Sequence, residues 1–133
     1  MGTRCLTFVY EKYGQIQKPV VNMYRQFDGY PTGHGAELAE FLCSGELVNG
    51  FSQTETRQFN GMGCLAAQMI ANFKNTVGGF YIYPVTSTDC WQEYEYHVYE
   101  NSVIVKSIDD RDQVIFNGTW QEFKEFCCSE ATN

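Results

Sequence analysis

Residues 20–42 read VVNMYRQFDGYPTGHGAELAEFL and carry three structural signals in succession. The β-rich run Val20–Phe27 predicts a strand. The segment 28–35 contains three glycines and a proline, which predicts a tight turn. Apolar residues then recur at the spacing of one helical face: Leu38, Phe41 and Leu42. A strand that passes through a sharp turn into a helix indicates that both kinds of element pack together in this fold.

The sequence on either side extends this pattern. Upstream, Leu6–Tyr10 is β-rich, and a polar connection with a glycine joins it to Val20–Phe27, which predicts a hairpin. Downstream, residues 45–60 are polar and show no period, so we expect irregular structure there. A second helix follows, ends near Gly78–Gly79 and has a broad apolar face. That face is formed by Leu65, Met69 and Phe73.

Four short β-like runs and a third helix complete the chain. The runs are Phe80–Tyr83, Tyr94–Tyr99, Val103–Ser107 and Val114–Phe116. The turn-sized gaps between them predict an antiparallel meander. Thr119 and Glu122 match the capping box, in which each side chain binds a backbone N–H at a helix start. The order of elements predicts an α+β fold, a mostly antiparallel sheet with two to three helices on one face, in a single domain 1–133.

The composition is that of a folded, acidic protein. Of its 133 residues, 44% are hydrophobic and 19% are charged, a balance that excludes a disordered chain. The formal net charge is −7, whereas a protein that coats nucleic acid needs a basic face. Residues 1–90 carry six basic and seven acidic side chains, so nearly all of the excess negative charge lies after residue 90.

The sequence predicts a cytoplasmic protein that makes no contact with a membrane. Glu11 and Lys12 interrupt the first apolar run, and no stretch approaches the roughly 18 apolar residues of a membrane span. In the cytosol we expect the six cysteines to stay reduced. None of them forms a C-x-x-C pair of the kind that binds zinc. We therefore expect neither a bound metal nor a cofactor.

The turn at 28–35 is the best candidate for an anion site. A helix that begins at its end would direct free backbone N–H groups toward a ligand, and the glycines would allow close approach. An arginine from a neighbouring strand could add a planar grip on phosphate. The predicted ligand-binding residues are Arg4, Arg25, Asp28, Tyr30, Gly33, His34 and Gly35. The alternative is that the glycines and the proline only shape a tight turn.

Seven aromatic residues within 80–99 offer surfaces on which a nucleobase could stack. The candidates for stacking are Tyr81, Tyr83, Trp91 and Tyr96. Alternation along paired strands would produce the same pattern, with one set of rings in the core and the other at a contact between subunits. Packing is the favoured interpretation, and a homo-oligomer is the expected state.

Catalytic motifs are scarce. The chain lacks the phosphate-binding loop Gly-x-x-x-x-Gly-Lys-Ser/Thr, and neither of its two histidines stands in a His-x-Ser/Thr pair. A set of Asp28, His34 and Arg25 could serve a small hydrolase or transferase that acts on a nucleotide. That activity is an alternative hypothesis, because we expect a binding protein rather than an enzyme.

Several motifs of this chain resemble a recurring family of small uncharacterised proteins found in bacteriophages and in some bacteria and fungi. They are Met1-Gly2-Thr3-Arg4, the turn Asp28-Gly29-Tyr30-Pro31-x-Gly33-x-Gly35, Gly61–Gln68, Gly78–Tyr81 and Gly118–Trp120. The last three resemble the phage branch. The resemblance implies a phage-encoded protein in the cytoplasm of an infected bacterium, and it carries no known reaction.

Together these features favour a phage-encoded protein that holds a small phosphorylated, nucleotide-like ligand. Its role would be to sequester an immune signal of the host, an anti-defence function. A second hypothesis is an inhibitor that binds a host protein through the acidic last third of the chain, with Glu93, Glu95 and Asp109 as contacts. The third is the small hydrolase or transferase.

Overall fold

The computed structural model describes residues 2–50 and 57–131. Its strands are β1 (Cys5–Tyr13), β2 (Ile16–Arg25), β3 (Gly45–Val48), β4 (Arg57–Asn60), β5 (Phe80–Tyr83), β6 (Tyr94–Tyr99), β7 (Ser102–Ser107) and β8 (Gln113–Thr119). Its helical segments are the π-helical turn η1 (Pro31–Gly35), α1 (Ala36–Cys43), α2 (Gly61–Phe73) and α3 (Trp120–Ala131). The predicted α+β class is confirmed.

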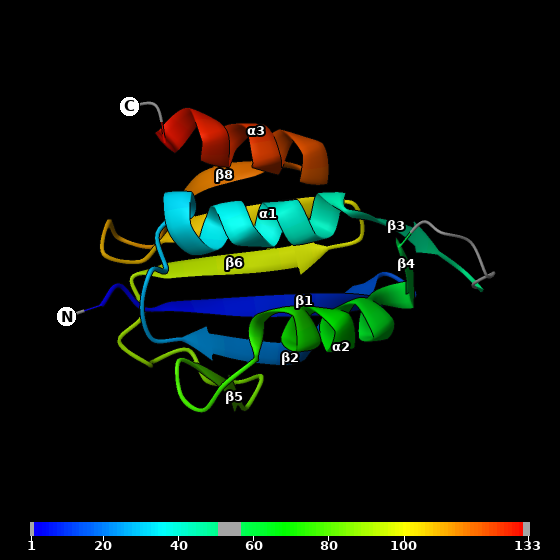
Figure 1. Ribbon diagram of the computed structural model, residues 1–133, viewed down its shortest axis with the longest axis horizontal. Helices are drawn as coiled ribbons and strands as arrows, with labels where there is room; N and C mark the ends of the chain where they lie inside the picture. Colours follow the sequence, from blue (N-terminus) through cyan, green and yellow to red (C-terminus); the bar gives the residue numbers. More distant parts are fainter. Residues whose placement is uncertain (1, 51–56, 132–133) are drawn as a thin grey trace.

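The main sheet has six strands in the order β5-β2-β1-β6-β7-β8, and α1, α2 and α3 lie on one of its faces (Figure 1). We call this side the helical face and the opposite side the back face. The neighbouring strands are antiparallel except for β1 and β6, which run parallel. The sheet is therefore mostly antiparallel, as predicted, and consists of two antiparallel halves that meet at one parallel junction.

The predicted meander is wrong for β5. This strand pairs with β2 at the edge of the sheet, whereas β6 pairs with β1. The connection 84–93 therefore runs from the edge back to the middle of the sheet. Asn22 secures its start, because its Nδ2 donates to the carbonyls of Pro84 at 3.1 Å and Ser87 at 3.0 Å. These long-range bonds leave no local signal in the sequence.

The expectation of irregular structure over residues 45–60 is wrong for Gly45–Val48 and Arg57–Asn60, which are strands. β3 and β4 form a small parallel sheet of two four-residue strands, and 51–56 lie outside the described residues. Strands this short show too few alternations for a period to be recognised. Phe59 of β4 is fully buried against the rings of Phe41 and Trp120, which ties this sheet to the helical face.

The second helix ends earlier than predicted, at Phe73 rather than near the Gly78–Gly79 pair. Lys74 leaves the helical conformation, and its ammonium donates to the carbonyls of Gly78 and Phe80, both at 2.9 Å. The two glycines have φ values of 77° and 78°, a conformation that glycine adopts at little cost. They therefore form the turn into β5 rather than the end of α2.

The start of α3 confirms the predicted capping box. The N–H of Thr119 donates to Glu122 Oε1 at 2.8 Å, and the N–H of Glu122 donates to Thr119 Oγ1 at 3.1 Å. The apolar stripe behind the cap is buried, as predicted, and comprises Trp120, Phe123 and Cys127. The cap therefore fixes where α3 begins, and the apolar stripe determines which of its faces is buried.

Thr119→Ala is expected to lower the free energy of unfolding by about 1 kcal/mol, because it removes one side-chain acceptor from the helix start. Chemical denaturation monitored by circular dichroism measures the change. Thr86→Ala, at an exposed threonine in the connection 84–93, is the matched control and should cost less than about 0.5 kcal/mol. Equal effects of the two substitutions would contradict a stabilising cap.

Candidate binding groove between α1 and α2

Arg25 stands at the end of β2 on the helical face, where most side chains of the sheet are apolar. It follows Val21 and Met23 in the alternation of the strand, and its own side chain is only 7% exposed. A charged group is rarely buried to this extent unless neighbouring groups compensate its charge. The contacts of Arg25 therefore identify the polar centre of this face.

Two side chains hold the Arg25 guanidinium through the same nitrogen. Nη1 donates to His34 Nδ1 at 3.2 Å and forms a short ion pair with Glu37 Oε2. The guanidinium also lies over the ring of Phe80, 4.9 Å from its centroid. Within the described residues, the buried Nε has no hydrogen-bond partner. Arg25 is thus firmly oriented, but its donors are not fully used.

His34 contacts Arg25 as a buried, neutral ring. It is fully buried, and burial, together with the charge of Arg25, lowers its pKa to about 3. The neutral ring accepts from Arg25 at Nδ1, because an arginine only donates, so Nε2 donates to Thr7 Oγ1 at 2.7 Å. Both ring nitrogens are therefore engaged within the protein.

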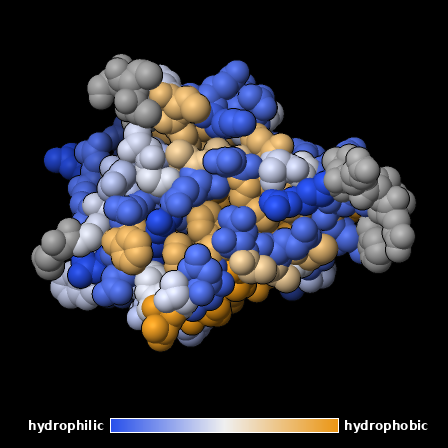
Figure 2. Space-filling model, in the orientation of Figure 1, coloured by the Kyte–Doolittle hydropathy of each residue, from blue (hydrophilic) through white to orange (hydrophobic). Residues whose placement is uncertain are grey.

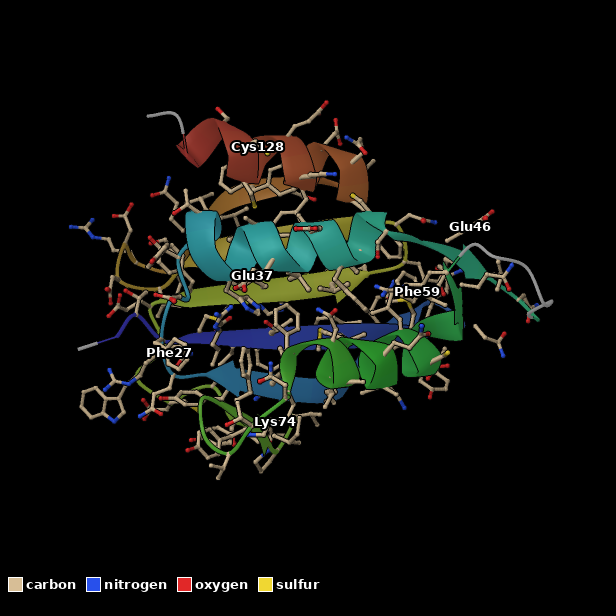
Figure 3. All side chains as sticks on the ribbon, in the orientation of Figure 1. Phe27, Glu37, Glu46, Phe59, Lys74 and Cys128 are labelled. Carbon is tan, nitrogen blue, oxygen red and sulfur yellow. The ribbon has the colours of Figure 1, made fainter. Side chains whose placement is uncertain are left out.

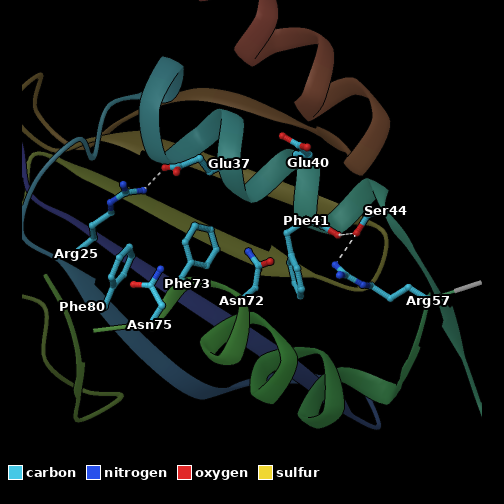
Figure 4. Close-up of a pocket in the computed structure, with 10 residues that line it drawn as sticks. All are labelled: Arg25, Glu37, Glu40, Phe41, Ser44, Arg57, Asn72, Phe73, Asn75 and Phe80. Carbon is cyan, nitrogen blue, oxygen red and sulfur yellow. Dashed lines mark hydrogen bonds and ion pairs between the residues drawn. The ribbon is translucent and has the colours of Figure 1, made fainter. Parts of the chain in front are cut away.

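A cavity of about 540 Å³ opens beside this arginine, between α1 and α2 (Figure 4). It is lined by Arg25, Glu37, Glu40, Phe41, Ser44, Arg57, Asn72, Phe73, Asn75 and Phe80. We call it the α1–α2 groove. Its volume falls within the roughly 300–1,000 Å³ of pockets that bind small molecules. Aromatic rings alternate with charged and amide groups along it, so it suits a ligand that has both a ring and polar groups.

The two arginines of the groove lie at its opposite ends in Figure 4. Arg57, on β4, is exposed and donates to Ser44 Oγ at 2.9 Å. Asn72 and Asn75 lie between them on the side of α2 and offer amide donors and acceptors. Glu37 projects from α1 toward this space (Figure 3). The groove therefore has an arginine near each end, amides between them, and two carboxylates, Glu37 and Glu40, on its α1 side.

Three backbone N–H groups of the turn at 28–35 are bonded within the turn itself. Gly33 N–H and Gly35 N–H both donate to the carbonyl of Tyr30, at 3.0 and 3.4 Å. His34 N–H donates to the carbonyl of Asp28 at 2.7 Å. These three amides are therefore used within the turn. Of the residues predicted for the anion site, only Arg25 lines the groove.

The other predicted binding residues lie elsewhere. Arg4 precedes β1, and its carbonyl accepts from Glu93 N–H at 2.9 Å. The hydroxyl of Tyr30 donates to Asp28 Oδ1 at 3.1 Å in an exposed position. Gly35 packs against Cys127 and Tyr96. None of these side chains lines the groove.

The four rings predicted to stack are divided among three environments. Tyr81 and Tyr83 lie on the back face beside Tyr24, with the rings of Tyr83 and Tyr24 stacked at 4.9 Å. Tyr96 is fully buried, and its hydroxyl donates to the carbonyl of Gly29 at 2.7 Å. Trp91 is 83% exposed. The structure does not bring these rings together around one ligand.

The two alternative hypotheses depend on an acid–base pair of Asp28 with His34 and on an acidic surface in the last third of the chain. The Asp28 carboxylate binds Tyr30, and Asp28 contacts His34 through its backbone carbonyl, so Asp28 and His34 form no acid–base pair.

In the acidic last third of the chain, Glu95 is 8% exposed and accepts from His97 at 2.9 Å. Burial alone would raise its pKa, but hydrogen bonds from His97 and Gln92 lower it. Glu95 is therefore bound within the protein rather than presented to a partner.

Sequence reasoning did not find most of the groove. Glu37, Arg57 and Asn72 come from α1, β4 and α2, Asn75 follows the end of α2, and none of the four belongs to a known motif. The helix predicted to run to Gly78–Gly79 would have put Asn72 and Asn75 on one side of it, but α2 ends at Phe73, and the chain beyond it brings Asn75 to the groove. The spacing of the two asparagines does not show what faces them.

The chain matches no protein-family model, and no curated protein or solved structure is significantly similar to it. Over residues 2–50 and 57–131, no helix is long and apolar enough to cross a lipid bilayer. In the same ranges, no three His, Cys, Asp or Glu side chains are grouped to hold a metal ion. All six cysteines are free thiols. The molecular surface on the side of the helices mixes polar and apolar side chains, with an apolar patch at the β5 edge (Figure 2), where Val77 and Ile82 are exposed.

Proposed function

We propose that the protein binds a small phosphorylated, nucleotide-like molecule in the α1–α2 groove. The observation that carries this proposal is Arg25, a nearly buried cation that is oriented by two side chains at the wall of a cavity of ligand size. Arginine binds phosphate oxygens through a planar fork of donors, and a partly dry site strengthens such bonds. The anionic group of the ligand therefore lies at Arg25.

The rest of the groove suits the remaining parts of a nucleotide. Phe73 and Phe80 provide rings, 5.5 Å apart, against which a base packs. Asn72 and Asn75 supply the paired donor and acceptor of a side-chain amide, which matches the edge of a nucleobase. Arg57 provides a second positive group for a ligand that extends along the groove.

The biological role that we propose is sequestration. The motifs that resemble the phage branch of the small-protein family suggest a protein made in an infected bacterium, where nucleotide signals of the host are natural ligands. No acid–base pair forms around His34. We expect the protein to hold its ligand without converting it, which suits the removal of a signal by binding.

Arg25→Ala is expected to weaken binding of the ligand by about 10- to 100-fold, the value of one or two charge-assisted hydrogen bonds. Isothermal titration with a panel of nucleoside mono- and diphosphates and cyclic nucleotides identifies a ligand and measures the change. Lys12→Ala removes one positive charge at the exposed β1–β2 hairpin and is the control for net charge.

Arg25→Lys extends this test, because it keeps the charge but removes the planar fork, and it should cause an intermediate loss. Chromatography of the incubated ligand should recover it intact. The proposal fails if no member of the panel binds, or if Arg25→Ala and Lys12→Ala have the same effect. Conversion of the ligand would favour the hydrolase hypothesis.

A further inference from the structure

The ion pair between Arg25 and Glu37 is unequal. The side chain of Arg25 is 7% exposed, whereas that of Glu37 is 53% exposed. The arginine is fixed by its strand and by His34, but the carboxylate reaches it from the first turn of α1, and half of its surface is in water. Of the two partners, Glu37 is therefore the one that can leave.

The pair also leaves the guanidinium short of acceptors. A single oxygen of Glu37 contacts Nη1, the nitrogen that already donates to His34. Nε has no acceptor within the described residues. Arginine and an anion commonly form two parallel bonds, so a one-oxygen contact uses only part of what the fork offers. A ligand with more acceptor oxygens would satisfy this arginine better.

Glu37 has a favourable position even without Arg25. It lies in the first turn of α1, where the helix dipole stabilises a negative charge. A half-exposed carboxylate also regains hydration when it turns outward. Moving Glu37 away from Arg25 therefore costs little, provided that another anion takes its place, because a buried arginine without a counter-charge is strongly unfavourable.

We propose that Glu37 is an internal competitor at the anion site, and that the group which displaces it is a phosphoryl group rather than a carboxylate. A ligand carboxylate would only replace one carboxylate by another, with no gain in charge or in acceptors. A phosphate monoester carries about −1.5 to −2 charges and three strong acceptor oxygens, so it gains over Glu37 on both counts. Glu37 thus sets the specificity of the groove, an inference that rests on the proposed function.

The test uses inorganic phosphate and acetate as probes, titrated into the full chain at pH 7.5 with ionic strength held constant by sodium chloride. Chemical shifts of backbone amides around Arg25 report binding. In the wild type, phosphate is expected to bind and acetate is not. Glu37→Gln is expected to bind phosphate at least about tenfold more tightly, a change of about 1.4 kcal/mol, and to acquire binding of acetate.

The matched control is Glu40→Gln, which removes the same charge from the same helix at a side chain that lines the groove. It should change phosphate affinity by less than about threefold, the effect of general electrostatics at an exposed site. Equal or weaker phosphate binding in Glu37→Gln, or equal effects of the two substitutions, overturns the inference. Phosphate binding that is lost in Arg25→Ala but unaffected by Glu37→Gln removes only the inference. No phosphate binding in any of these proteins overturns the proposed function as well.

Discussion

Acidification from pH 6.5 to pH 4 is expected to lower the free energy of unfolding by about 3 kcal/mol through His34 alone. Burial, together with Arg25, depresses the pKa of His34 to about 3 in the folded protein, whereas an unfolded histidine titrates near pH 6.5. Between these values the unfolded chain binds a proton that the folded protein excludes. Stability therefore falls as the pH drops through this window, by up to about 1.4 kcal/mol for each pH unit.

Urea unfolding at intervals between pH 7 and pH 4 measures this slope. His34→Asn keeps an acceptor and a donor but does not titrate, so it should flatten the slope between pH 6.5 and pH 5, above the range in which carboxylates titrate. If the variant does not fold, the ring protons of His34 in the wild type give an independent measurement by NMR. Their shifts should stay constant from pH 8 to pH 5, and titration near pH 6.5 would contradict the burial of this ring.

Local features of the fold could be predicted from the sequence, because they depend on residues that are close together in the chain. The capping box at Thr119 and Glu122 is complete within four residues, and its two bonds form as predicted. The strand Tyr94–Tyr99 has the predicted limits, since β-rich runs between turns mark it. The place of β5 could not be predicted, because it depends on bonds from Asn22 to residues more than 60 positions away.

The candidate site was predictable only in part, for the same physical reason. An arginine among the apolar residues of a strand is unusual, and Arg25 was singled out on sequence alone. Glu37 on α1 and the asparagine amides at the end of α2 and just after it come near Arg25 only when the two helices pack side by side over the sheet. The glycine-rich turn was predicted to bind an anion because glycines permit a ligand to approach the backbone closely. In the structure, the protein itself approaches them: backbone and side-chain atoms at Gly29 and Gly33, and side chains at Gly35.

Gly33→Ala is expected to cost about 3 kcal/mol or more of stability, since overpacking of a rigid site commonly costs 1–3 kcal/mol and a backbone clash costs more. A Cβ atom at this position would lie 2.5 Å from the carbonyl oxygen of Asp28 and 2.9 Å from the ring of Tyr30. That oxygen is held in place, because it accepts the N–H of His34 at 2.7 Å. The turn cannot yield without moving His34.

Gly63→Ala is the matched control, and its effect should have the opposite sign. Gly63 lies on the exposed side of α2, and no atom stands within 4 Å of its added Cβ. Alanine is more stable than glycine by about 1 kcal/mol in a helix interior, and Gly63, the third residue of α2, should gain less than that. Thermal and urea unfolding of both variants measure the contrast.

The contrast also decides between the two explanations of the turn. If Gly33→Ala keeps the stability of the wild type and loses only ligand binding, the glycines contact the ligand, and the anion site lies at the turn. If it lowers stability in the absence of any ligand, the turn is the support that places His34 under Arg25. The second outcome is expected, because the clash is with the protein itself. The glycines would then contribute to binding only indirectly, by fixing the arginine that faces the groove.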